Sequence, residues 1–161
     1  MKKNTKAFSL IEILVVISIF AIIGVLSTRS IFQTLRSARK SDSLIRVREN
    51  VNYALGIIER QVRNAESVNC ASVTPLNLPY VAGDGVPTFF NCTLGAIGRI
   101  ASGSAILTSN DISITACNFT CTPTVNNPPS ITISITAEDN TSTGPEKGSV
   151  TSQTEILLRN Y

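Results

Sequence analysis

Three patterns of apolar and polar positions follow one another along the 161-residue chain. Residues 8–28 are almost wholly apolar, and residues 13–28 carry no charged side chain. A helix needs about 20 apolar residues to cross a bilayer, so this segment is long enough to span one. From residue 31 onward the apolar positions continue in steps of three and four. This spacing predicts a helix with one apolar stripe that extends to about Glu66.

After Val68 the pattern changes to a period of two. Residues 112–116 and 131–135 alternate apolar with hydroxyl side chains, which predicts strands with one buried face. Further strands are predicted at Thr88–Asn91, Ala96–Ile100, Ala105–Thr108 and Thr154–Arg159. Short turn-forming segments separate them, among them Asn126–Pro129, and turns this short join antiparallel strands. We therefore expect the helical stripe over residues 44–65 to pack on one antiparallel sheet.

Charge is unevenly distributed between these segments. Three lysines precede the apolar run, residues 29–66 hold eight basic and four acidic side chains, and residues 67–161 hold three basic and six acidic ones. The net charge of +3 therefore combines a basic helix with an acidic C-terminal region, and nucleic-acid binding is not indicated. Arg46, Glu59 and Arg63 fall opposite the apolar stripe, where we expect them to face solvent.

Catalytic chemistry has little support in the sequence. Histidine is absent, so the commonest general base is missing, and no P-loop, GxSxG or HExxH motif occurs. Glu138, Asp139 and Glu146 flank a loop rich in Gly, Ser and Thr, which we expect to be a solvated turn rather than a calcium site. The sequence thus favours a protein that is not an enzyme and holds no metal or cofactor.

Four cysteines, Cys70, Cys92, Cys117 and Cys121, lie in the C-terminal region without the spacing of a zinc site. Two disulfides in an oxidising compartment are the favoured interpretation. Of the three possible pairings we favour Cys70–Cys92 and Cys117–Cys121, because both close loops within contiguous sequence. The second bond requires a tight turn at residues 118–120, since a fully extended strand would hold its Cα atoms about 13 Å apart.

Glu12 is the one charged residue inside the apolar run, where an ionised carboxylate costs about 2.5–3.5 kcal/mol on insertion scales. The lysines before the run and Val25-Leu26-Ser27 at its end also suit a secretory signal peptide, which would leave Thr28 as the first mature residue. However, the run exceeds the roughly 7–15 apolar residues of such a signal. The cysteines place the N-terminus in the cytoplasm and the C-terminal region outside.

The stretch Lys6-Ala7-Phe8-Ser9-Leu10-Ile11-Glu12, with the apolar run behind it, resembles the processing signal of type IV prepilins and type II secretion pseudopilins. Ala7 and Ser9 stand where glycine and threonine are usual in that family. The resemblance implies that a membrane aspartic peptidase cleaves between Ala7 and Phe8 and that the new Phe8 amine is methylated. Residues 151–161 resemble the last strand of PilW-type minor pilins and J-type pseudopilins.

The resemblance also implies a fold and a function. The fold is α+β, a pilin-like lollipop whose long N-terminal helix spans the membrane in its first half and packs on an antiparallel sheet. The expected parts are a leader (1–7), a fibre-core helix (8–28), an amphipathic helix (29–66) and a disulfide-stabilised β head (67–161). The expected function is that of a structural, minor subunit of a type IV pilus or type II secretion pseudopilus.

The expected partners are the prepilin peptidase and methylase, other pilin or pseudopilin subunits and an inner-membrane assembly platform. The precursor would cross the cytoplasmic membrane once, and the mature form would enter an extracellular or periplasmic filament. There Glu12 of one subunit is expected to neutralise the Phe8 amine of a neighbour, so that each charge gains its partner on assembly. The alternative is a secreted or membrane-tethered β-rich binding domain with an ordinary signal peptide.

Overall fold

The computed structural model describes residues 9–123 and 129–158 of the chain. Within these ranges lie one α-helix, seven β-strands and two short 3-10 helices, η1 (Cys70–Ser72) and η2 (Gly144–Glu146). Most of the turn predicted at Asn126–Pro129 and the end of the strand predicted to reach Arg159 lie outside the described residues. The chain divides into two compact units, residues 1–39 and 40–161, and each is described by itself.

Helix α1 (Leu10–Arg63) begins directly after Ser9, whose carbonyl oxygen accepts hydrogen bonds from the N–H groups of Glu12 and Ile13. No proline interrupts the sequence between Ala7 and Val73, and the helix continues through the polar residues 41–43. In the second unit it buries one stripe, as the spacing predicts. That stripe consists of Ser43, Val47, Val51, Ala54, Leu55, Ile58 and Val62.

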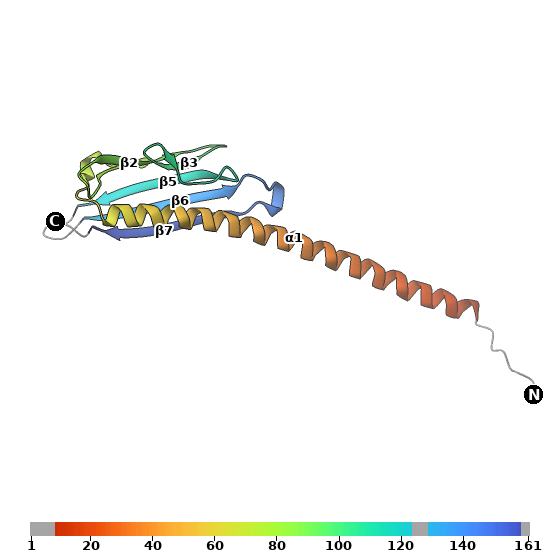
Figure 1. Cartoon of the computed structure of the whole chain (residues 1–161). Coiled ribbons are helices and arrows are strands. Elements are labelled where there is room, and N and C mark those ends of the chain that lie inside the picture. The colour runs from red at the N-terminus through yellow and green to blue at the C-terminus, as the bar shows by residue number, and fades with distance from the viewer. Residues whose placement is uncertain (1–8, 124–128, 159–161) are drawn as a thin grey trace, which may run out of the picture. The chain divides into compact units, whose positions relative to one another are not determined.

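The second unit contains two antiparallel sheets (Figure 1). The first has the strand order β1-β2-β3-β4, with β1 (Asn77–Val81), β2 (Pro87–Thr93), β3 (Arg99–Ser102) and β4 (Ala105–Ile106). The second has the order β5-β6-β7, with β5 (Ile112–Thr122), β6 (Ser130–Asp139) and β7 (Ser149–Leu157). The expectation of a single sheet is therefore wrong. Two-residue β4 ends the first sheet, and the turn at residues 109–111 leads the chain into the second.

Two strand predictions in the first sheet are also wrong. β1 is not among the predicted strands. It carries Pro79 at its centre and lies at the edge of its sheet, where proline is tolerated. Ala96 and Ile97 lie in a turn rather than in a strand. Gly95 opens that turn with a φ of 123°, a backbone conformation that favours glycine.

A β-bulge changes the phase of β5. Ile114 lies opposite Ala137 and Ala116 lies opposite Thr136, so Thr115 is the extra residue on β5. Before the bulge Ile114 is buried; after it Ala116 is exposed, and the odd-numbered residues turn inward instead. The expectation that Ala116 shares the buried face of Ile114 is therefore wrong.

One hydrophobic core joins the helix stripe to both sheets. The first sheet contributes Leu78, Tyr80, Phe90, Cys92 and Ile100, and the Tyr80 and Phe90 rings stack with centroids 5.2 Å apart. The second sheet contributes mainly isoleucines: Ile112, Ile114, Ile131, Ile133, Ile135 and Ile156. The helix segment in this unit is thus the common cover for two sheets.

Candidate functional site

The described part of the first unit is an apolar helix whose surface is not buried by any other segment of that unit. Every described residue from Ser9 to Asp42 is exposed, including Leu10 at 78%, Phe20 at 70% and Ile31 at 61%. In the described part of the chain, α1 is the one helix long and apolar enough to cross a membrane, by length and composition. This exposed surface is the main candidate for function.

Three hydroxyl groups along this helix bond to the helix itself. Ser18 Oγ donates to the Leu14 carbonyl over 2.8 Å, and Thr28 Oγ1 donates to the Gly24 carbonyl over 2.8 Å. Thr34 makes the same i−4 contact. Because a hydroxyl in hydrocarbon has no water to bond, this arrangement suits a segment immersed in lipid or in other apolar helices.

Glu12 lies in the first turn of α1 and is exposed. A carboxylate at this end of a helix is favoured by the partial positive charge of the free N–H groups. Within residues 9–123 and 129–158, no basic side chain forms an ion pair with Glu12. Ala7 and Phe8, the predicted cleavage and methylation residues, lie outside the described residues.

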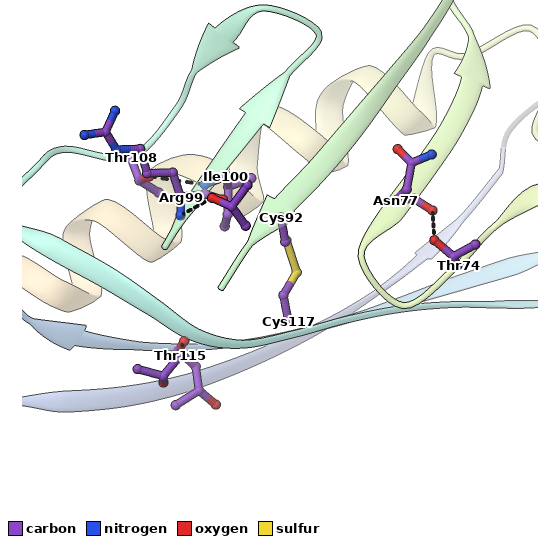
Figure 2. Close-up of a disulfide and its surroundings, with 10 residues drawn as sticks. Thr74, Asn77, Cys92, Arg99, Ile100, Thr108, Thr115 and Cys117 are labelled. Carbon is purple, nitrogen blue, oxygen red and sulfur yellow. Dashed lines mark hydrogen bonds between the residues drawn. A yellow bond between two sulfur atoms is a disulfide. The ribbon is translucent and has the colours of Figure 1, made fainter. Parts of the chain in front are cut away.

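All four cysteines form disulfides, but with a different pairing from the one we favoured. Cys70 is bonded to Cys121 with a Cα–Cα distance of 5.2 Å, and Cys92 is bonded to Cys117 at 6.3 Å (Figure 2). β5 runs without a turn through residues 112–122, so Cys117 and Cys121 lie too far apart along one strand to bond to each other.

Both disulfides therefore end on β5 and connect it to other elements. Cys92 belongs to β2, so its bond to Cys117 links the two sheets. Cys70 opens η1, shortly after the end of α1, so its bond to Cys121 ties the segment that follows the helix to β5. The two bonds hold together the second unit, residues 40–161, which is called the head from here on.

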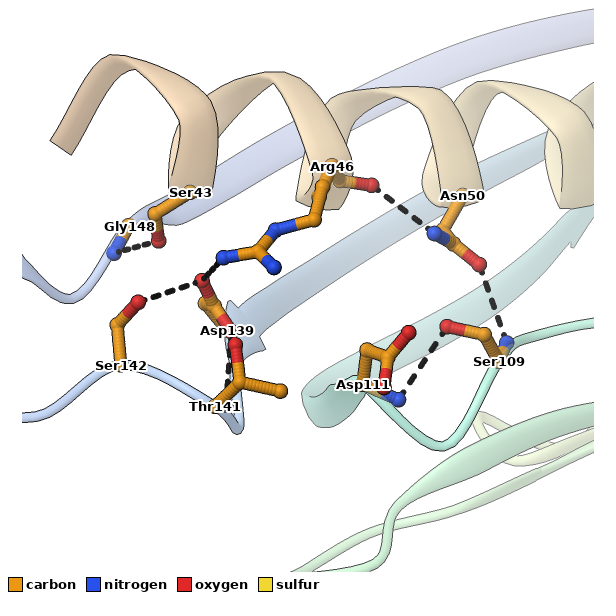
Figure 3. A network of polar contacts seen from close by, with 9 residues as sticks. All are labelled: Ser43, Arg46, Asn50, Ser109, Asp111, Asp139, Thr141, Ser142 and Gly148. Carbon is orange, nitrogen blue, oxygen red and sulfur yellow. Dashed lines mark hydrogen bonds and ion pairs between the residues drawn. The ribbon is translucent and has the colours of Figure 1, made fainter. Parts of the chain in front are cut away.

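A network of polar contacts anchors the helix to one end of the second sheet (Figure 3). Arg46 Nη2 lies 3.1 Å from Asp139 Oδ2, and the other oxygen of that carboxylate accepts bonds from Thr141 N–H at 2.8 Å and Thr141 Oγ1 at 2.7 Å. Ser142 Oγ donates to Oδ2 over 2.9 Å. One helix turn away, Gly148 N–H donates to Ser43 Oγ over 2.8 Å.

This network corrects two expectations. Arg46 is half exposed but pairs with Asp139 instead of facing only solvent, and Asp139, expected in a solvated turn, is fully buried. Burial alone would raise the pKa of Asp139, but hydrogen bonds from Ser43, Thr141 and Ser142 outweigh it and hold that pKa well below its ordinary value of 3.8. The carboxylate is therefore ionised and structural. The side chains of Glu59 and Arg63 are exposed, as expected, and form an ion pair one helix turn apart.

A cleft of about 440 Å³ lies beside the C-terminal part of the helix. Tyr80 Oη donates to Gln61 Oε1 over 2.7 Å, and Ser102 Oγ donates to the same oxygen over 3.3 Å. Burial raises the pKa of Tyr80, so its hydroxyl stays protonated near neutral pH. These contacts join α1 to β1 and β3, and among the described residues no group of three His, Cys, Asp or Glu is placed to hold a metal ion.

Comparison with known proteins identifies the N-terminal segment. Residues 2–28 match the family described as the prokaryotic N-terminal methylation motif, and this match includes Ala7, Phe8 and Glu12. No curated protein and no solved structure matches the chain. The motif is that of pilin-like proteins, which are structural and are not enzymes, and the exposed apolar helix is of the kind that anchors a prepilin in a membrane. The chain is therefore a prepilin-like protein with an N-terminal methylation motif and an α+β fold.

Proposed function

We propose that the chain is a minor subunit of a type IV pilus or type II secretion pseudopilus. The observation that carries this proposal is the coincidence of the methylation motif at residues 2–28 with a helix surface that is exposed on all sides through residue 42. Such a surface needs lipid in the precursor and neighbouring helices in a filament. The likeness of residues 151–161 to PilW-type minor pilins and J-type pseudopilins supports the minor role.

Processing would create the charge that Glu12 needs. A membrane peptidase cleaves between Ala7 and Phe8, and the free amine of Phe8 is then methylated and carries a positive charge. In lipid the Glu12 carboxylate costs about 2.5–3.5 kcal/mol, and a buried amine carries a comparable penalty. Pairing Glu12 of one subunit with Phe8 of the next relieves both penalties, which favours assembly and fixes the axial offset between subunits.

The partners follow from this route. The prepilin peptidase and methylase act on the leader at the cytoplasmic face, and an inner-membrane assembly platform moves the mature subunit into a filament of pilin or pseudopilin subunits. The precursor crosses the membrane once, with its N-terminus in the cytoplasm and the head outside. Two disulfides in the head agree with an oxidising compartment.

The test is the variant Glu12→Ala in the full-length chain. Cleavage and methylation are expected to proceed, because the carboxylate lies beyond the cleaved bond, while incorporation into filaments is lost. Mass spectrometry of the purified protein reports the first result through an N-methylated Phe8, and immunoblotting of sheared filaments reports the second. Glu49→Ala removes another exposed carboxylate from α1, outside the apolar run, and is the matched control.

If Glu12→Ala enters filaments as efficiently as the wild type, that result would contradict the pairing of Glu12 with the Phe8 amine. A mature wild-type chain that begins at Thr28 would contradict the whole proposal and support an ordinary signal peptide on a secreted binding domain.

A further inference from the structure

The two sheets have four outer strands, and the first sheet protects both of its own. β1 carries Pro79 at its centre, and its last residue, Val81, exchanges backbone hydrogen bonds with Glu66 and Ser67. β4 has two residues and offers almost no edge. Proline, short length and covering backbone are the usual means by which proteins prevent an edge strand from pairing with another chain.

The outer edge of β5 is covered at two places. Ile114 N–H donates to the Gly98 carbonyl over 3.0 Å, and the Ile114 carbonyl accepts from Gly95 N–H at 3.4 Å. Further along, Phe119 N–H donates to the Pro75 carbonyl over 3.0 Å. Three of the four outer strands are therefore blocked, and β7 remains.

The backbone groups at the open edge of β7 can be identified from the ends of its pairing with β6. Asp139 N–H donates to the Gly148 carbonyl, and Leu158 N–H donates to the Pro129 carbonyl. Hydrogen-bonded positions alternate along an antiparallel pair, so the even-numbered residues of β7 bond to β6. The odd-numbered residues point their N–H and C=O groups away from β6. They are Ser149, Thr151, Gln153, Glu155 and Leu157, all of them exposed.

Apart from the charge of Glu155, β7 lacks the usual protection of an edge strand. The strand is nine residues long, SVTSQTEIL, with no proline, no lysine and one charge, and its register with β6 has no bulge. Among the described residues, no backbone hydrogen bond joins the five outward positions to another segment. An edge of this kind is a template for a further strand.

We propose that β7 pairs with β7 of a second copy of this chain. Because β6 occupies the other edge, two copies can meet through β7 only about a two-fold axis, in antiparallel orientation. With the axis at Gln153, every outward residue meets an outward residue, so all the free N–H and C=O groups are matched. Thr151 then lies opposite Glu155 of the second copy, and Val150 lies opposite its Ile156. No like charges face each other in this register.

The symmetry determines how the two copies are oriented. The helix segment of the head and β7 run in the same direction, from the contact of Ser43 with Gly148 toward the far end of the sheet (Figure 1). Antiparallel β7 strands therefore place these two helix segments antiparallel. The pairing rests on the edge of β7 alone and does not depend on the proposed function.

Cysteine cross-linking tests the pairing in full-length protein in detergent. All four native cysteines are in disulfides, so Gln153→Cys adds one free thiol on the proposed axis. Directly opposite residues in a hydrogen-bonded antiparallel pair lie about 5.5 Å apart, within the span of a disulfide. Oxidation is expected to give a covalent dimer. Asn118→Cys, also exposed but on β5, is expected to stay monomeric and is the matched control.

Charge exchange provides a second test. Gln153→Lys and Gln153→Glu each place like charges opposite each other, so sedimentation is expected to show a shift from dimer to monomer for each variant alone. Mixing the two is expected to restore the dimer. Glu12→Ala leaves β7 unchanged and is expected to dimerise as the wild type does. The Glu12 variant therefore tests filament assembly and the Gln153 variants test β7 pairing, so failure of one proposal can be told from failure of the other.

Three results would overturn the proposal. The first is a wild-type chain that sediments as a monomer at every concentration tested. The second is equal cross-linking of Asn118→Cys, which would indicate random collisions. The third is a cross-link from Gln153→Cys to a different protein, which would assign the edge to another partner.

Discussion

At the scale of single residues, Asp139 is a buried carboxylate that the fold keeps ionised. Its side chain is 1% exposed, yet four hydrogen-bond donors from Arg46, Thr141 and Ser142 reach its two oxygens. Hydrogen bonds to a charged group are worth about 1.5–3 kcal/mol each in net terms, more than neutral ones. Asp139 therefore connects the loop after β6 to the helix.

Asp139→Asn is expected to lower the free energy of unfolding by about 3 kcal/mol at neutral pH, because the amide nitrogen would face either Arg46 or the Thr141 N–H, which can only donate. Chemical denaturation measures this change. Glu138→Gln, which removes a carboxylate paired with Lys147 at the surface, is the control and is expected to change stability by less than about 1 kcal/mol.

The same residue gives the head a pH dependence with a definite sign. The folded-state pKa of Asp139 is depressed, so its contribution to stability is complete above about pH 4 and is lost as the pH falls below that value toward the folded-state pKa. Wild-type stability should decline in this acid range more steeply than that of Asp139→Asn. If the stability of the two proteins falls in parallel as the pH decreases, the role assigned to the Asp139 carboxylate is contradicted.

At the scale of secondary-structure elements, the contact between α1 and the start of β7 depends on Gly148. A Cβ atom added there would lie 2.7 Å from Ser43 Oγ and 2.8 Å from the Leu44 backbone nitrogen. The backbone of the loop thus approaches the helix more closely than any other residue type allows. By contrast, a Cβ at Gly56, on the exposed side of the same helix, would meet nothing within 4 Å.

Gly148→Ala is expected to destabilise the head by about 1–3 kcal/mol, because the helix backbone must move away from the sheet. Gly56→Ala is expected to stabilise it by about 0.5–1 kcal/mol, because alanine loses less conformational entropy than glycine in a helix. Thermal unfolding of the two variants beside the wild type measures both changes. Equal shifts in the same direction would show that the loop is not held against the helix.

At the scale of the whole molecule, the two compact units bury apolar surface in different ways. Residues 40–161 hold a hydrophobic core formed by a helix and two sheets, and two disulfides reinforce it. The described part of residues 1–39 buries no side chain. The head can therefore be stable in water, whereas the N-terminal unit depends on surroundings that the chain does not supply.

Removing each disulfide is expected to destabilise the head according to the length of the loop it closes. The bond between Cys70 and Cys121 spans 51 residues and that between Cys92 and Cys117 spans 25, so the loop-entropy relation predicts losses of about 4 and about 3.5 kcal/mol. Double alanine variants, compared by denaturant unfolding, measure both. Peptide mapping without reduction is the direct check of connectivity, and a peptide joining Cys70 to Cys92 would contradict the structure.

The sequence by itself determined the features that depend on local pattern. The long helix follows from the three-and-four spacing and the absence of proline, the β head from the period of two, and the N-terminal motif from seven consecutive residues. Each of these signals is contained within a few helix turns or a single strand. It can therefore be recognised without knowing which distant residues are in contact. The match of residues 2–28 to the methylation motif confirms the last of them.

Only the tertiary structure decided what depends on residues far apart in the chain. The disulfide pairing was wrong because it was argued from proximity in sequence, whereas β5 carries Cys117 and Cys121 on one face and presents them to two different segments. The bulge at Thr115 produces that face, and its sequence signal is the shift of apolar positions from even to odd numbers after Ile114. Arg46 and Asp139 are 93 residues apart and meet only in the folded head, since packing, not local preference, selects such partners.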